Sequence, residues 1–362
     1  MRIFRTRKCV YVLPLIALLI VLMFFLHYHN LETVTTTQTK YDPEKQELIQ
    51  VLKKAAMEDR TVILTMVDES HARPGSMLEV FLQSFEYGQG TQRFLNHLVI
   101  ITTDPQAFRY CRLLHQHCIH PATFQPYFSA RRPSVTSVTT PDHTVLFSWR
   151  RNHVLIQVIE LGYNIIFTVR NNGLLINLNN CMYDVTFVLM QETDVLWLKS
   201  PLVNFHPQYE LSISCNFVNV GESAFSVQEG GIFFMKANYV TPGFLQDWKL
   251  TKILHPNSTV DESMCATLEL HKDLVDINGV RVHGIDTNHF GGFCQTYNDM
   301  LEDAYTIHAN CCHDLKSKVH DLRIVLDDWI RFRNRVSKNN ATEKIALRWP
   351  QKCTEHTALE FP

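Results

Sequence analysis

The sequence predicts an α/β protein in which helices flank a Rossmann-like, mostly parallel central sheet. Between residues 61 and 168, short apolar segments typical of strands alternate with segments of helical spacing. Such alternation requires crossover connections that place consecutive strands parallel to one another. A chain of 362 residues can also bury a large core, either in one big domain or in two small ones.

The first strand is expected at 61–67, where the sequence reads TVILTMV, and a helix with glycines at both ends is expected at 75–90. A second strand is expected at 97–103. The helix that follows, at 104–118, has Asp104 as a candidate N-cap and Pro105 at its first helical position.

A loop rich in proline, serine and threonine is expected at 121–144, followed by a helix at 147–163 and a strand at 165–168. That helix has a broad apolar face, formed by Val154, Ile156, Val158, Ile159 and Leu161. Ligands of parallel sheets bind beyond the carboxyl ends of the strands. We therefore expect the binding site in the loops after Val67, after Thr103 and before Trp197.

The N-terminal segment predicts a membrane anchor. Four basic residues, Arg2, Arg5, Arg7 and Lys8, precede an uncharged run of 17 residues from Val10 to Leu26. As a helix this run rises about 25 Å, at the short end of what spans a bilayer. The basic flank stays cytoplasmic, so the rest of the chain is expected in the lumen of the endoplasmic reticulum or Golgi, where thin membranes suit a short span. A secretory signal peptide is the alternative, but the run lacks a small-x-small cleavage site.

Other features agree with a lumenal body. Sequons occur at Asn257 and Asn340, and nine of the ten cysteines lie beyond the anchor, where disulfides can form. Cys111 and Cys118 are close enough in sequence to pair across a helix end, while the adjacent cysteines 311 and 312 need separate partners. The net charge of −2 gives no electrostatic case for nucleic acid, and no cysteine or histidine spacing indicates a zinc site.

An acid pair at the end of an apolar run indicates a metal site. Glu192 and Asp194 flank Thr193 immediately before the run VLWLKSPL. Residues two apart in a strand point to the same side, so both carboxylates can face one ion. Hard oxygen ligands suit Mg²⁺ or Mn²⁺, which bind substrate phosphates and keep open positions. A solvated surface turn is the alternative for such a triplet.

Seven longer stretches between about Thr61 and Trp329 form a far more specific pattern. They read ARPGSMLEVFLQSF, GTQRFLNHLVIITTDPQAF, ELGYNIIFT, TDVLWLKSPL, GGIFFMKANYVT, DTNHFGGFCQ and IHANCCHDLKSKVHDLRIVLDDW. This pattern resembles the plant nucleotide-diphospho-sugar transferases of glycosyltransferase family seventy-seven. The resemblance implies a GT-A fold, Golgi residence with a type II anchor, a UDP-sugar donor, a divalent cation and retention at the anomeric carbon. It also implies transfer of xylose, arabinose or galactose to cell-wall polysaccharides or glycoproteins.

The expected organisation follows from these features together. The chain is expected to comprise a cytoplasmic tail at 1–9, a transmembrane signal anchor at 10–27, a stem at 28–58 that becomes helical from Pro43, a lumenal catalytic domain at 59–336 and a C-terminal tail at 337–362. The expected partners are the donor, the acceptor, the membrane through the anchor, and further copies or other chains in a Golgi oligomer.

An insertion interrupts the resemblance. In the family the strand GYNIIFT runs directly into Asp-x-Asp and VLW, whereas here 23 residues, 169–191, intervene. Val-Arg can be encoded GTAAGR and Gln can be encoded CAG, like the two boundaries of an intron. We interpret 169–191 as a retained intron or a gene-model insertion. A genuine surface insertion is the alternative, because loops tolerate added length.

The resemblance implies the roles of the metal ligands. Glu192 stands where the family usually has Asp, and Asp194 matches the family. His308 in IHANCC fits the third ligand usual in GT-A enzymes, although a lone histidine in an apolar segment can also be a core residue. An imidazole ligand accepts Mn²⁺ well, so manganese is expected rather than magnesium.

Residues of the donor site are expected from their positions beside strands and helices. Asp68 and Ser70 follow the first strand and are expected to hold uracil and ribose, unless they form an ordinary turn. Arg150 and Arg151 open the helix before the metal strand, and one of them, preferably Arg151, is expected to neutralise the diphosphate. A solvated helix start is the alternative for both.

The resemblance places two further segments at the sugar. Asp261 and Glu262 correspond to an Asp-Gln dipeptide that lies by the reacting carbon in similar retaining enzymes, although Asp261 could simply be an N-cap. The stretch DTNHFGGFCQ is expected to shape the sugar pocket through Asp286, Gly291 and Gly292, where glycines permit close approach of the backbone. A tight turn would explain the two glycines equally well.

The sequence therefore predicts a metal-dependent, retaining glycosyltransferase. A catalytically degenerate, glycosyltransferase-like Golgi scaffold protein is the alternative, because Glu192, Glu262 and the insertion each depart from the family pattern. A metal-dependent phosphohydrolase is a weaker alternative, since it would need a second acid cluster.

Overall fold

The computed structural model describes residues 43–120, 143–168, 174–177, 193–221, 224–254, 264–270, 272–293, 301–310, 312, 314–336, 348 and 350–353. Residues Glu47–Pro362 form one compact unit and Met1–Gln46 another. Within the described ranges, no helix combines the length and the apolar character needed to cross a membrane. The predicted anchor at 10–27 and both sequons lie outside these ranges.

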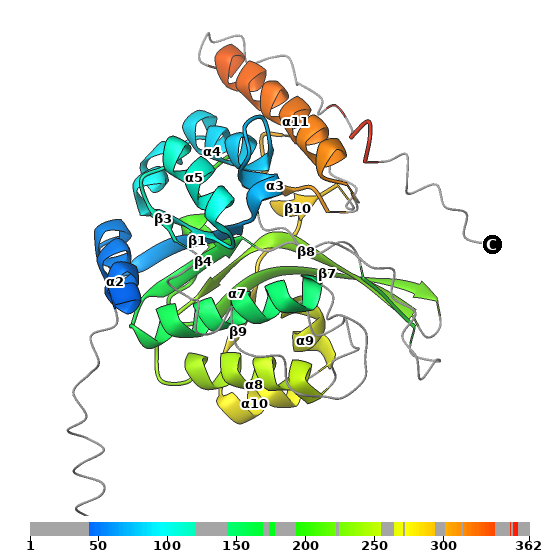
Figure 1. Ribbon diagram of the computed structural model, residues 1–362. Coiled ribbons are helices and arrows are strands. Elements are labelled where there is room, and N and C mark those ends of the chain that lie inside the picture. Colours follow the sequence, from blue (N-terminus) through cyan, green and yellow to red (C-terminus); the bar gives the residue numbers. More distant parts are fainter. Residues whose placement is uncertain are drawn as a thin grey trace, which may run out of the picture. The chain divides into compact units, whose positions relative to one another are not determined.

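A sheet of eight strands, counted over the described residues, forms the centre of the larger unit (Figure 1). Its order is β3 (Cys118–Ile119), β2 (Leu98–Thr102), β1 (Thr61–Val67), β4 (Asn164–Thr168), β8 (Ala224–Met235), β7 (Leu211–Gly221) and β9 (Val282–Gly284), with β5 (Leu174–Asn177) also paired to β8. The strands β3, β2, β1 and β4 are mutually parallel. Strand β8 runs antiparallel to β4, β5 and β7. The predicted mixed α/β architecture with a mostly parallel sheet is confirmed, and a long β7–β8 hairpin extends it.

The elements predicted first along the chain are present. The strands expected at 61–67, 97–103 and 165–168 correspond to β1, β2 and β4. The helix expected at 75–90 is α4 (Met77–Tyr87), and the one expected at 104–118 is α5 (Pro105–Leu114). Asp104 caps α5 as predicted, because its carboxylate accepts hydrogen bonds from the backbone amides of Gln106 and Ala107. Helix α5 ends before the predicted residue 118 because the chain turns there into β3.

Alternate residues of β1 divide the core into two layers. Val62, Leu64 and Met66 belong to a buried cluster with α2 (Pro43–Ala55), α7 (His143–Glu160), α8 (Thr241–Leu254) and α9 (Met264–Leu270). Ile63 and Val67 belong to a second cluster with α3 (Glu69–Ala72), α4 and α5. Side chains alternate between the faces of a strand, so helices cover both faces of the sheet, as Figure 1 shows. Four residues of the apolar face predicted for 147–163 are buried in the first layer, on α7, whereas Leu161 follows the helix and is partly buried.

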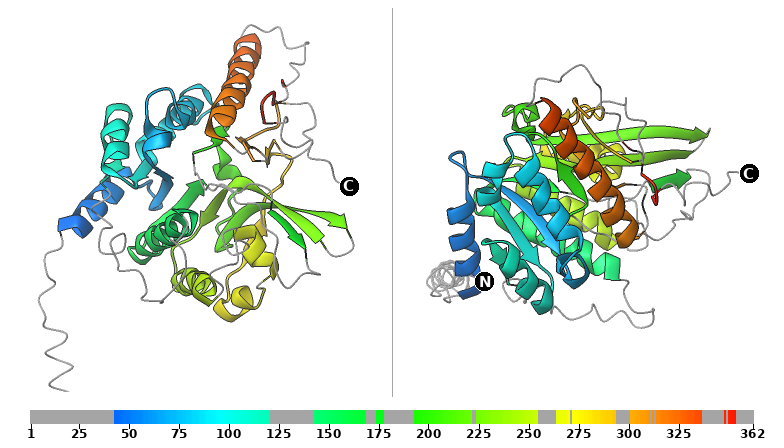
Figure 2. Two further views of the ribbon diagram at one scale, coloured as in Figure 1. Left: turned by 45° about the vertical axis from the view of Figure 1, so that its right-hand side comes forward. Right: turned by 90° about the horizontal axis from the view of Figure 1, so that it is seen from above.

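A second, three-stranded sheet lies beside the first and carries the C-terminal helix. Strand β11 (Thr306–His308) pairs in parallel with β10 (Phe290–Gly292) and antiparallel with β6 (Val195–Trp197). Helix α11 (Leu315–Val336) packs against α4 and this small sheet through a third buried cluster that includes Leu322, Val325 and Trp329 (Figure 2). The remaining described helices are the short segments η1 (Gln92–His97), η3 (Pro201–Asn204) and α10 (Lys272–Asn278).

Three disulfides join described cysteines. Cys111 pairs with Cys118, as predicted, and Cys215 pairs with Cys265. Cys312 pairs with Cys353, which ties the end of the chain to the segment between β11 and α11. The buried carboxylate of Asp321 also accepts hydrogen bonds from the amides of residues 352 and 353. Cys311 lies outside the described residues.

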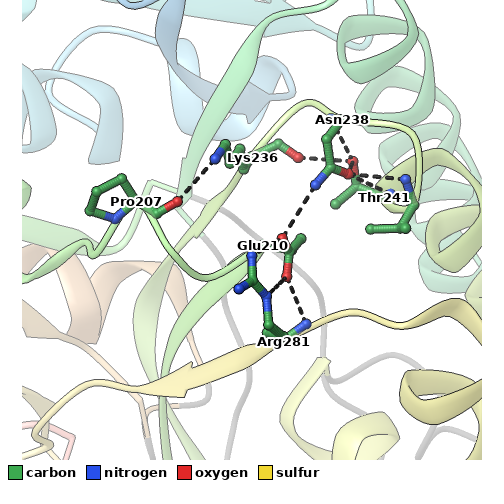
Figure 3. Close-up of polar contacts among 7 residues, drawn as sticks. Pro207, Glu210, Lys236, Asn238, Thr241 and Arg281 are labelled. Atoms are coloured by element: carbon green, nitrogen blue, oxygen red, sulfur yellow. Dashed lines mark hydrogen bonds and ion pairs between the residues drawn. The ribbon is translucent and has the colours of Figure 1, made fainter.

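The buried carboxylate of Glu210 links three segments, namely the start of β7, the end of β8 and the start of β9 (Figure 3). Glu210 accepts hydrogen bonds from the Arg281 guanidinium at 2.8 and 3.0 Å and from the Arg281 amide at 2.9 Å. Asn238 donates a further, longer bond of 3.4 Å to the same carboxylate. The hydrogen bonds from Arg281 lower the pKa of Glu210 from its ordinary value of 4.5 to about 2. The charged form of Glu210 is therefore the form that the fold stabilises.

Glu210 gives the fold a predictable acid sensitivity. A carboxylate whose pKa is lowered on folding stabilises the fold above its unfolded pKa, and that stability is lost as the pH falls toward the folded pKa. We expect the free energy of unfolding to decline between pH 4.5 and about 2. Glu210→Gln should lower it by about 2 kcal/mol at neutral pH and flatten this decline. Urea unfolding over pH 2–7 measures both effects; Glu86→Gln, at an exposed position on α4, is the control. Equal curves for the two variants would contradict this role of Glu210.

Candidate active site

The pairing of β6 with β11 brings the two predicted metal ligands Asp194 and His308 together. Asp194 immediately precedes β6, and His308 is the last residue of β11, where it pairs with Val195. The Ala309 amide donates a hydrogen bond of 2.9 Å to the Asp194 carbonyl, which joins these two segments of the chain at this point. His308 Nε2 lies 3.3 Å from Asp194 Oδ1, and both side chains are fully buried. The register of β6 with β11 therefore places the side chains of Asp194 and His308 next to each other.

Lys318 completes the cluster, although it is not among the site residues predicted from the sequence. Its Nζ lies 2.5 Å from Asp194 Oδ2, and its side chain is fully buried in the first turn of α11. A signal for this residue is present in the sequence, because Lys318 has helical spacing with the buried residues Leu322, Val325 and Trp329. A lysine on the apolar face of a helix needs a buried partner, and Asp194 is that partner.

Two glycines press against His308. Gly231 of β8 has φ +77°, and a Cβ on it would lie 2.5 Å from Val195 Cγ2 and 2.8 Å from His308 Cγ. A Cβ on Gly292 of β10 would lie 2.4 Å from the His308 carbonyl oxygen and 2.3 Å from Asn310 Oδ1. Neither position has space for a side chain. The two glycines therefore allow β8 and β10 to lie close to His308. Gly291 lies beside Gly292 in β10, opposite Ile307.

The spacing of Asp194 and His308 is that of two neighbouring ligands of a divalent cation, and it is also that of an Asp–His ion pair. A carboxylate oxygen and an imidazole nitrogen are ligands that Mn²⁺ accepts. Neighbouring ligands of an octahedral ion, with bonds of about 2.1 Å, lie about 3 Å apart, and the Oδ1–Nε2 distance is 3.3 Å. Across the described residues, no group of three or more His, Cys, Asp or Glu side chains forms a complete metal site. The predicted ligand Glu192 lies outside them.

A second polar cluster lies at the carboxyl ends of β1 and β2. Asp68 caps α3 and contacts Nδ1 of the buried His71 at 2.5 Å, while Ser70 Oγ donates to Asp68 at 2.8 Å. Asp104, which follows β2, accepts a hydrogen bond of 2.8 Å from the Glu69 amide. Burial raises the pKa of Asp68, but the hydrogen bond and the electrostatic interaction with His71 outweigh this effect. The pKa of Asp68 therefore falls from its ordinary value of 3.8 to about 2. The predicted residues Asp68 and Ser70 thus share one charged, hydrogen-bonded site with His71, which the sequence analysis missed.

The structure places the other predicted residues in different surroundings. Arg151 is buried, and its guanidinium lies 5.3 Å from the Trp248 ring centroid, where α7 packs on α8. Arg150 precedes it on α7. The half-exposed Asp286 accepts a hydrogen bond of 2.9 Å from the Asn288 amide, which shapes the turn before β10. Asp261 and Glu262 lie outside the described residues.

Comparison with known proteins decides the family. A sequence model described as nucleotide-diphospho-sugar transferase matches residues 93–169 and 183–322. The chain belongs to this family. It is therefore a glycosyltransferase that uses a nucleotide-sugar donor, as the motifs predict.

Two relatives from Arabidopsis thaliana cover most of the chain. The uncharacterized protein At1g28695 is 30% identical over 86% of this chain and 85% of its own length. The uncharacterized protein At4g15970 is 29% identical over 88% of this chain and 76% of its own length. Among solved structures, the apo form of the bifunctional glycosyltransferase WbbM is similar at a TM-score of 0.34 and 7% identity, over 74% of this chain and half of that one.

The match to the family breaks inside the predicted insertion. Residues 170–182 are not matched, and they fall within 169–191. The described part of the insertion is β5, which pairs antiparallel with residues 224–227 of β8. The origin of 169–191 as an intron or gene-model insertion stays a prediction.

Proposed function

We propose that this glycosyltransferase has the GT-A fold, depends on a divalent cation and retains the anomeric configuration of the sugar. The donor is a UDP-sugar carrying xylose, arabinose or galactose, and the acceptor is a cell-wall polysaccharide or a glycoprotein. The observation that best supports metal dependence is the buried pair of Asp194 and His308, whose facing atoms are 3.3 Å apart.

The residues of the cluster have two proposed roles, metal ligation and orientation of a ligand. Asp194 Oδ1 and His308 Nε2 would hold Mn²⁺, or Mg²⁺, with Glu192 as a further ligand. A cation bound there would supply positive charge that stabilises the diphosphate as leaving group. Lys318 binds the other carboxylate oxygen, Oδ2, and so fixes the direction in which Oδ1 faces. Pre-set orientation matters because a misplacement of about 1 Å can cost about a hundredfold in rate.

The remaining predicted residues complete the proposed donor site. Asp68 and Ser70 hold the uridine at the end of β1, where polar groups of this kind fix the orientation of a ligand. Asp286, Gly291 and Gly292 shape the sugar pocket. Arg150 or Arg151 neutralises the diphosphate, and Asp261 with Glu262 orients the donor at the reacting carbon.

The proposed location is the Golgi membrane. Residues 10–27 form the single span of a type II protein, and the catalytic domain, 59–336, lies in the lumen. A homo- or hetero-oligomer in that membrane is part of the proposal.

Titration of the full chain with UDP and Mn²⁺ tests metal dependence. We expect Mn²⁺ to tighten UDP binding, and His308→Ala to remove this coupling because it removes one of the two described ligands. Screening UDP-sugars by UDP release then identifies the donor, with a form lacking 169–191 measured alongside. No coupling between UDP and Mn²⁺ in either form would contradict the proposal and favour the scaffold alternative.

A further inference from the structure

A groove runs between α11 and the loop that joins α3 to α4. It encloses about 510 Å³, which is within the size range of small-ligand sites. One wall is the loop Arg73–Ser76, and the other is the face of α11 that carries Lys316, His320 and Arg323. Figure 1 shows α11 beside α4, the helix that follows the loop forming the first wall.

The charged side chains of the groove are mostly cationic. Arg73, Lys316 and Arg323 line it and are exposed, and Asp327 is the acidic residue among the lining residues. Lys316, His320 and Arg323 recur at helical spacing, so they lie on one face of α11. The whole chain has a net charge of −2, so this excess of positive charge is local. A ligand that matches it carries negative charge.

The Arg323 guanidinium reaches across the groove. Its Nη2 donates a hydrogen bond of 3.0 Å to the Gly75 carbonyl on the opposite wall. Guanidinium has five N–H donors in a planar fork that suits a carboxylate, so this bond leaves further donors for a ligand. The two walls of the groove are therefore joined by a hydrogen bond that the Arg323 guanidinium donates.

Apolar side chains complete the lining. Leu315, Val319 and Ile324 of α11 and Pro74 of the loop contribute them. Pyranose rings present C–H faces as well as hydroxyl groups, so a lining that mixes cations with aliphatic side chains suits a sugar chain that bears carboxylates. A bare inorganic anion would gain nothing from the aliphatic residues.

The groove also adjoins both clusters of the candidate active site along the chain. Its loop wall begins directly after α3, which follows Asp68, and Ser76 Oγ donates a hydrogen bond of 2.7 Å to the Ser70 carbonyl. Its helical wall includes Lys316 and Val319, which flank the buried Lys318. A ligand in the groove would therefore contact α11, which also carries Lys318, and the loop that follows α3, which is hydrogen-bonded to Ser70.

We propose that this groove binds the acceptor, and that the acceptor is a carboxylate-bearing oligosaccharide or polysaccharide. This proposal rests on the proposed function, in which Asp194 and His308 bind the cation and the donor's diphosphate. The cationic side chains of the groove are then available for the acidic chain that receives the sugar.

The test is calorimetric titration of the full chain with a short oligogalacturonate and with its fully methyl-esterified, neutral form. We expect Arg323→Gln to weaken binding of the acidic form about tenfold, because it removes a charged hydrogen-bonding partner. Lys316→Gln should have a similar effect and leaves the bond between Arg323 and Gly75 intact. Arg331→Gln is the matched control, since Arg331 is an exposed arginine of α11 outside the groove. Thermal unfolding of each variant confirms that it is folded.

Stronger binding of the acidic form, reduced by Arg323→Gln and Lys316→Gln but not by Arg331→Gln, supports the proposal. Equal binding of acidic and neutral forms, or equal loss in all three variants, would overturn it. It is also overturned if Arg323→Gln weakens UDP–Mn²⁺ binding instead, because the groove then belongs to the donor site. Acidic binding without UDP–Mn²⁺ coupling in the unaltered chain would leave the groove in place and reject the proposed function alone.

Discussion

Asp194→Asn is expected to slow sugar transfer strongly and to destabilise the fold. Lys318 Nζ and Asp194 Oδ2 are 2.5 Å apart, and both side chains are fully buried. Removing the carboxylate charge takes away the charged group that the buried ammonium contacts most closely, which costs about 3–5 kcal/mol in unfolding free energy. Loss of a proposed metal ligand should also lower the rate about a hundredfold or more. Urea unfolding and UDP release measure the two effects.

The double variant Asp194→Asn with Lys318→Met separates the two effects. Removing both charges of a buried pair is often neutral for stability, so the double variant should recover most of the lost unfolding free energy. It should not recover transfer, because the metal ligand is still missing. Full stability of the single variant, or transfer by the double variant, would contradict the role assigned to Asp194.

Gly231→Ala is expected to have the second-largest effect. Its φ of +77° disfavours any side chain, and the new Cβ would lie 2.5 Å from Val195 Cγ2 and 2.8 Å from His308 Cγ. Backbone strain and overpacking together should cost about 3 kcal/mol of unfolding free energy. The clash should also displace the His308 ring, so Mn²⁺-dependent UDP binding should weaken in any variant that still folds. Thermal unfolding and UDP titration measure these losses.

Gly279→Ala is the matched control for this prediction. Gly279 has φ +67°, but no atom lies within 4 Å of the Cβ that alanine would add. This variant therefore carries the backbone strain without the clash at His308. It should lose about 1 kcal/mol and keep UDP–Mn²⁺ coupling. Indistinguishable behaviour of the two variants would show that Gly231 does not set the position of His308.

Local sequence patterns predict the first half of the fold well. Strands β1, β2 and β4 are short apolar runs bounded by polar residues, and α5 begins with an Asp-Pro signal, so each can be recognised without its neighbours. The small sheet could not be recognised in this way. Each of β6, β10 and β11 has three residues, too few for a period, and their pairing depends on contacts between residues far apart in the chain.

The candidate site is predictable to a different degree for each residue. Asp194 and His308 are found from the motifs that carry the family resemblance, and the structure brings them together. Lys318 is visible only as a charged residue on the apolar face of a helix. For Arg151 the start of the helix matters. Helix α7 begins at His143, one turn before the predicted start, so Arg151 lies one turn further from the helix start than expected. There it contacts Trp248 in the packing of α7 on α8.

Electron spin-echo spectroscopy of Mn²⁺ bound to the full chain with UDP tests most directly whether Asp194 and His308 hold the cation that carries the donor. The nitrogen of a metal-bound imidazole modulates the Mn²⁺ echo, so ligation by His308 has its own spectral signature. We predict nitrogen modulation together with phosphorus coupling from UDP, and loss of the nitrogen modulation in His308→Ala. A Mn²⁺–UDP complex without nitrogen modulation, or with modulation that survives in His308→Ala, would contradict the proposed metal site.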